Sequence, residues 1–81
     1  MRMSSYNIPK ALDAIVKNIG DNASWRRSAY TDEKYVVTVN GQEIDIFYND
    51  IDGGYWIQYP NTVPSSSLID EIHSCMTENK Y

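Results

Sequence analysis

The sequence is poor in the residues that build reactive or metal-binding sites. It has a single cysteine, Cys75, so no internal disulfide can staple the fold. It also has a single histidine, His73, and one cysteine with one histidine cannot form a structural zinc site. Both residues fall in a segment, residues 65–78, that we expect to be helical. On a helix, residues two apart point to different sides, so this pair cannot act as nucleophile and base. We therefore expect no catalytic residues, no metal and no cofactor.

Long hydrophobic runs are also missing. No stretch approaches the roughly 20 apolar residues of a transmembrane helix. Residues 1–6 lack the apolar run of a signal peptide. We therefore expect a cytoplasmic protein that does not bind membranes.

Basic residues become scarce after the first third of the chain. Residues 1–31 contain five basic and two acidic residues, whereas residues 32–81 contain two basic and nine acidic ones, for a net charge of −4. This distribution predicts a negative field over the second part of the chain, which disfavours direct binding of nucleic acid. The same field favours a basic partner protein.

What the sequence does contain is enough for one small core. Its 81 residues, 42% of them hydrophobic, predict a single domain over residues 1–81. Seven of its residues are tyrosines. Because tyrosine combines a large apolar ring with a polar tip, this content suits an interaction surface.

Two segments have helical periodicity. Apolar residues recur on one helical face between Ile8 and Ile19, which predicts a helix over about residues 9–19 with Pro9 at its start and Gly20 beyond its end. A second apolar stripe predicts a helix over about residues 65–78. Ser67 and Asp70 resemble a capping pair at its start.

The clearest local signal is Asn40-Gly41, which favours a two-residue type I′ turn between strands at about 34–39 and 42–48. This turn pairs Val39 with Gln42 and so fixes which residues share a face. The apolar set, which we expect to face the core, is Tyr35, Val37, Val39, Ile44, Ile46 and Tyr48.

A third strand is expected at about residues 54–59, ended by Pro60. Residues 21–33 are predicted to be a connection, in which a short helical turn around Trp25 could insert the indole into the core. The predicted fold is a two-layer α+β domain of order α-β-β-β-α. Its three-stranded antiparallel sheet has both helices on one face. Residues 21–33 could instead fold over the other face.

The sheet face away from the helices is the candidate binding surface. We expect aromatic and aliphatic side chains across three adjacent strands, with polar and acidic residues around them and an acidic loop beside them. The candidate contact residues are Val36, Phe47, Trp56, Glu43, Asp45, Asp50, Asp52 and Gln58.

The α-β-β-β-α order resembles that of the double-stranded RNA-binding domain. That family grips phosphate with lysines at the start of its last helix. The corresponding residues 65–70 here contain no lysine, so the resemblance does not imply RNA binding.

In size, charge and tyrosine content the chain is similar to small acidic phage proteins that inhibit host defence, such as anti-CRISPR and anti-restriction proteins. This resemblance implies an inhibitor that acts in the host cytoplasm by occluding a basic, nucleic-acid-handling surface of a larger protein. An immunity protein or antitoxin that neutralises a nuclease is an alternative, because it would also occlude a basic surface with an acidic one. A homodimer whose open faces pair is a further alternative.

Overall fold

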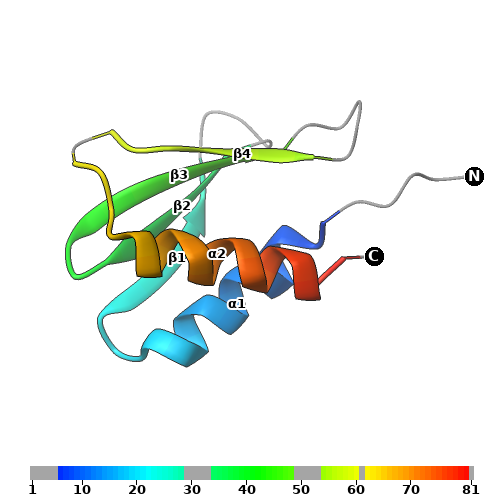
Figure 1. The fold of residues 1–81 in the computed structure, drawn as a ribbon, viewed down its shortest axis with the longest axis horizontal. Helices are drawn as coiled ribbons and strands as arrows, with labels where there is room; N and C mark the ends of the chain where they lie inside the picture. Colours follow the sequence, from blue (N-terminus) through cyan, green and yellow to red (C-terminus); the bar gives the residue numbers. More distant parts are fainter. Residues whose placement is uncertain (1–5, 29–33, 49–53, 61, 81) are drawn as a thin grey trace, which may run out of the picture.

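The computed structural model describes residues 6–28, 34–48, 54–60 and 62–80. Its elements are α1 (Ile8–Ile19), β1 (Ala23–Arg27), β2 (Lys34–Val39), β3 (Gln42–Tyr48), β4 (Tyr55–Gln58) and α2 (Ser66–Glu78). The α+β class with two helices and an antiparallel sheet is confirmed, but the sheet has four strands and not three. They follow one another in the order β1-β2-β3-β4, so the element order is α-β-β-β-β-α (Figure 1).

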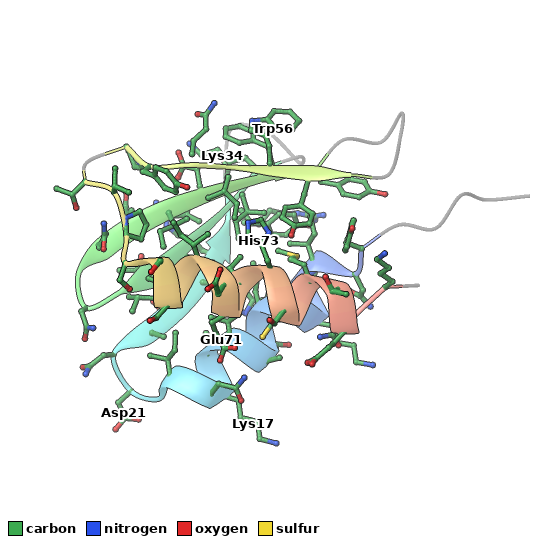
Figure 2. The ribbon with its side chains drawn as sticks, in the orientation of Figure 1. Lys17, Asp21, Lys34, Trp56, Glu71 and His73 are labelled. Atoms are coloured by element: carbon green, nitrogen blue, oxygen red, sulfur yellow. The ribbon has the colours of Figure 1, made fainter. Side chains whose placement is uncertain are left out.

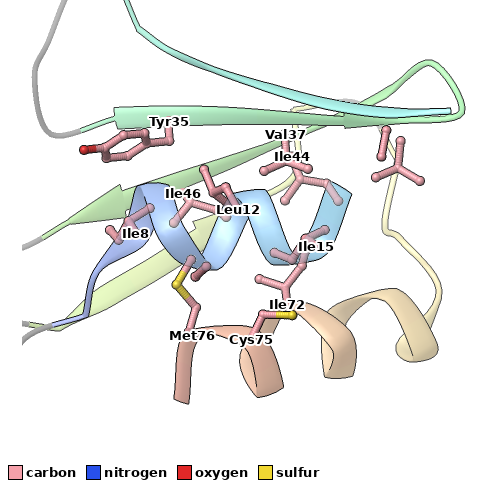
Figure 3. Packing of buried hydrophobic residues seen from close by; sticks show 13 residues of the cluster. Ile8, Leu12, Ile15, Tyr35, Val37, Ile44, Ile46, Ile72, Cys75 and Met76 are labelled. Atoms are coloured by element: carbon pink, nitrogen blue, oxygen red, sulfur yellow. The ribbon is translucent and has the colours of Figure 1, made fainter. Parts of the chain in front are cut away.

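Both helices lie on the same face of the sheet, so the fold has two layers (Figure 1). Their apolar stripes meet the apolar face of β2 and β3 in one core. Figure 3 shows this packing, in which side chains of α1, the sheet and α2 fill the space between the layers. The fully buried members with the largest side chains are Ile8, Leu12, Ile15, Val37, Ile44, Ile46, Ile72, Cys75 and Met76.

Local chemistry sets the helix ends. The Asn7 side chain accepts a hydrogen bond from the Lys10 backbone N–H at 3.3 Å, and α1 ends at Gly20, whose φ of 103° favours glycine. The expected capping pair of Ser67 and Asp70 is wrong. The cap of α2 is Ser65, whose hydroxyl accepts from the backbone N–H of Leu68 at 3.2 Å.

The main correction to the predicted fold concerns residues 23–27, which form strand β1 and not part of a connection. Trp25 lies opposite Val37 of β2, and its indole N–H donates to Asp13 of α1 at 2.8 Å. Residues 23–27 therefore extend the sheet beside β2 and do not cover its open face. Residues 29–33 lie outside the described part of the chain.

The turn between β2 and β3 has the conformation expected of Asn-Gly. Asn40 has φ of 52° and Gly41 has φ of 81°, the positive values that a type I′ turn requires. Val39 lies opposite Gln42 and Val37 opposite Ile44, so the predicted register is confirmed.

The two ends of the described chain meet beside β4 and α2. Tyr6 and Lys80 form an isolated antiparallel bridge, and the backbone N–H of Asn7 donates to the Asn79 carbonyl at 2.7 Å. The Tyr6 ring packs edge-on against Tyr55 of β4, with their centroids 4.8 Å apart. Within the described residues, no helix combines the length and apolar composition needed to cross a bilayer.

Candidate interaction surface

The surface in question is the sheet face that carries neither helix, which we call the open face. The register of the four strands assigns alternate residues to it. Figure 2 shows Trp56 and Lys34 on this side of the sheet, away from α2. Its members are Ser24, Arg26, Lys34, Val36, Thr38, Glu43, Asp45, Phe47, Trp56 and Gln58.

Two aromatic rings stack on this face. Phe47 and Trp56 are direct cross-strand partners on β3 and β4. Their centroids are 5.1 Å apart and their planes differ by only 7°. Trp56 remains 46% exposed. A large, flat apolar surface that stacks on a neighbouring ring is therefore open to solvent.

Lys34 connects the aromatic pair to an acidic residue. Its ammonium lies 5.8 Å from the centroid of Phe47 and 3.4 Å from a carboxylate oxygen of Asp45. The side chains of Lys34 and Asp45 are only 30% and 13% exposed, so the pair is partly sheltered from water. Lys34 thus makes a cation–π contact and an ion pair at the same time.

A second ion pair crosses the centre of the face. Arg26 of β1 reaches Glu43 of β3 at 3.6 Å, spanning the intervening strand β2. Val36 of β2 lies between Arg26 and Asp45 in the register and is only 3% exposed. Among the candidate contact residues, Val36 therefore offers almost no surface of its own. It forms part of the support beneath the exposed side chains.

The open face carries two basic and two acidic residues, each paired with another, so it has no net charge. The described residues together contain six basic and seven acidic side chains. Most of the acidic excess of the sequence belongs to residues 29–33 and 49–53, which contain four acids. Asp50 and Asp52 are among these four and lie outside the described residues.

The two residues considered for nucleophilic chemistry have separate partners. His73 Nδ1 shares a hydrogen bond with the Tyr55 hydroxyl, and burial raises the pKa of Tyr55, as does nearby Tyr6. Cys75 is 2% exposed and receives a long hydrogen bond, 3.9 Å, from Asn18.

The electrostatic surroundings of Cys75 oppose thiolate formation. Burial raises the pKa of its thiol, and the carboxylates of Glu71 and Glu78 raise it further, against a smaller lowering by the Asn18 amide. The thiol is therefore neutral at neutral pH, whereas a nucleophilic cysteine needs a lowered pKa and access to substrate.

Elsewhere on the described surface, no three histidine, cysteine, aspartate or glutamate side chains gather closely enough to hold a metal ion. A groove of about 470 Å³ lies on the helix side of the sheet, near the β2–β3 turn. Its lining combines the apolar residues Ile19, Val39 and Leu68 with polar and acidic ones. The Gln42 side chain, which lines this groove, donates a hydrogen bond to the backbone carbonyl of Thr62, in the segment between β4 and α2, at 2.7 Å. None of the candidate contact residues that the structure describes lines this groove.

Comparisons with protein-family models, with curated proteins and with solved structures give no match to this chain. The resemblance to the double-stranded RNA-binding domain rested on an α-β-β-β-α order. The fourth strand removes that basis.

The turn register already assigned Lys34 to this face, but the candidate contact residues chosen from the sequence included neither Lys34 nor Arg26. Alternation of Ala23, Ser24, Trp25 and Arg26 was the available signal for β1. Arg27 obscured it, because a charged residue stands at a position that faces the core. Its guanidinium carbon lies 5.5 Å from the Tyr35 ring centroid and a nitrogen donates to the Tyr35 hydroxyl at 3.2 Å, while the side chain stays exposed.

Proposed function

We propose that this chain is a binding protein that acts by covering a functional surface of another protein with its open face. The observation that supports this most directly is the Phe47–Trp56 stack. Its rings are nearly parallel, and Trp56 is 46% exposed on a side that neither helix covers. Rigid aromatic side chains of this kind dominate the binding energy of protein interfaces.

The balance of charge on the open face favours a protein over a nucleic acid as partner. Stacked aromatic residues on a sheet also bind single-stranded nucleic acid, but such sites need free cations for the phosphates. Here Arg26 is paired with Glu43, and Lys34 with Asp45. A phosphate backbone would have to break these pairs and would approach a chain of net charge −4.

A basic partner fits the charge of the whole chain. Four acids of the sequence lie in residues 29–33 and 49–53, which directly adjoin Lys34 and Tyr48 at the ends of β2 and β3 nearest to the aromatic pair. In the finer form of the proposal, the chain is a phage-type anti-defence inhibitor. Its aromatic pair provides affinity, and its acids steer it to the nucleic-acid-handling surface of a host protein.

The test uses Trp56→Ala and a matched control, Val63→Ala. Val63 is 76% exposed, so its truncation also removes exposed apolar surface but away from the stack. Both variants are compared with wild type in affinity capture from host lysate, followed by binding measurements on the purified partner. We expect Trp56→Ala to weaken binding by 2 kcal/mol or more, roughly thirtyfold, and Val63→Ala to change it little.

The captured partner must also lose nucleic-acid binding when wild-type protein is added. A defence protein would support the anti-defence form, and a nuclease toxin would support the immunity form. A partner that binds both variants as tightly as wild type would show that the open face is not the contact surface.

A further inference from the structure

The two edges of the sheet differ in how they are protected. At the first edge, β1 carries the exposed charges of Arg26 and Arg27, and its Trp25 is tied to α1. At the other edge, β4 reads Tyr55-Trp56-Ile57-Gln58, without a charged residue or a proline. Charges on an edge strand prevent pairing with another chain, whereas an uncharged apolar edge allows it.

The part of the chain from β4 to the start of α2 carries exposed apolar side chains. In the described part of the chain, three large apolar side chains are exposed, and all belong to β4 or to the segment that follows it. They are Trp56 at 46%, Tyr59 at 39% and Val63 at 76%. Trp56 belongs to the open face and Val63 lies five residues beyond β4, so Tyr59 is the exposed apolar residue that directly adjoins this edge strand.

We propose that β4 pairs antiparallel with β4 of a second copy of this chain, which joins the two sheets into one of eight strands. The edge is suited to a copy of itself because a two-fold axis beside β4 brings the same neutral strand to both sides. No like charges meet across such a pairing. In the described sheet β4 has a strand partner on one side only, so the backbone groups on its other side would bond to those of the second copy.

Antiparallel pairing keeps the open faces of both copies on the same side of the joined sheet. The Phe47–Trp56 stacks of the two copies would then lie on one continuous surface, and neither would be covered. This dimer is therefore independent of the proposed partner binding and compatible with it. It differs from a dimer formed face to face, in which both stacks would be buried.

The short edge predicts a weak dimer. β4 has four residues, whereas stable interfaces bury roughly 1,200–2,000 Å² in total. We therefore expect the population of dimer to rise with concentration across the micromolar range. Sedimentation velocity of the purified chain should show a shift from 9.3 kDa toward twice that mass.

The deciding variants place one lysine at each edge. Gln58→Lys adds a charge to β4 next to Asp45, which lies opposite on β3, and Ser24→Lys adds the same charge to the exposed face of β1. Thermal unfolding of both variants confirms that each is folded. We expect Gln58→Lys to raise the dimer dissociation constant roughly tenfold or more and Ser24→Lys to leave it unchanged.

Amide hydrogen exchange then locates the contact. In the proposed dimer, backbone amides of β4 gain protection with rising protein concentration, and those of β1 do not. A wild-type chain that remains a monomer up to millimolar concentration overturns the proposal, as does a dimer without added protection in β4. Because these measurements use the chain alone, either result leaves the partner-binding proposal standing.

Discussion

The two faces of the sheet are buried by different means. On the covered face, Val37 and Ile44 are fully buried beneath two helices. On the open face no helix is present, yet Val36 is only 3% exposed. Its cross-strand partners there are Arg26 and Asp45, and we infer that long side chains such as that of Arg26 shield it, because their aliphatic stems can cover apolar surface while their charged ends stay in water. A polar face can thus contain a core-like position.

The largest expected effect contrasts the two faces directly. Ile44→Ala opens a cavity in the covered core and should lower the free energy of unfolding by about 2–5 kcal/mol. Trp56→Ala removes a larger side chain but one that is 46% exposed, so it should cost clearly less. Urea unfolding of both variants provides the comparison. Equal losses would mean that the open face contributes as much to the fold as the helix-packed core.

A sharper contrast uses two neighbouring valines of β2. Val37→Ala and Val36→Ala remove the same atoms from opposite faces, and each should cost roughly 1–3 kcal/mol. We expect Val37→Ala to cost more. The helices packed around Val37 cannot move in to fill the cavity that its truncation leaves, whereas the side chains around Val36 can shift into the space that its truncation opens. The order is read from urea midpoints at unchanged slope. A larger loss for Val36→Ala would contradict the inference that movable polar side chains shield Val36.

The register of β2 and β3, and with it the content of both faces, was predictable because it is local. Asn40 and Gly41 take up positive φ, and a two-residue turn leaves only one pairing of the flanking strands. The stack of Phe47 on Trp56 follows once β4 pairs with β3. For this reason the aromatic part of the surface could be named from sequence.

The burial of Val36 was not predictable because it depends on β1. The sequence that connects β1 to β2 contains no turn motif comparable to Asn40-Gly41, so it does not reveal that the two strands pair. In addition, Arg27 breaks the apolar pattern of the core face of β1. Only with β1 in place does Arg26 lie beside Val36. A strand with one charged inward position is stabilised by a tertiary contact, here with Tyr35, that sequence periodicity cannot show.

The two stacked rings of the aromatic pair should stabilise each other. A double-mutant cycle with Phe47→Leu and Trp56→Leu should yield a coupling of about 0.5–1.5 kcal/mol in unfolding free energy, because leucine keeps apolar bulk but removes the stacked geometry. The cycle Phe47→Leu with Val63→Ala is the control and should be additive. A coupling near zero in the first cycle would mean that the stack is not held together in solution. The open face would then lack the preorganised anchor that the proposed function requires.

The smallest expected effects distinguish the two ion pairs that cross the open face. Glu43→Gln and Asp45→Asn each remove a charge and keep the shape of the side chain. The Arg26–Glu43 pair is 61% and 46% exposed, so Glu43→Gln should cost at most about 1 kcal/mol, a loss that disappears at high salt.

Asp45→Asn should cost more and depend less on salt. Asp45 is 13% exposed, and Lys34 would be left beside Phe47 without its counter-charge. Urea unfolding at low and high sodium chloride measures both dependences. If Glu43→Gln proves the more damaging change, Arg26 is held in place by its charge, and the shielding of Val36 depends on that ion pair more than on the packing of the arginine stem.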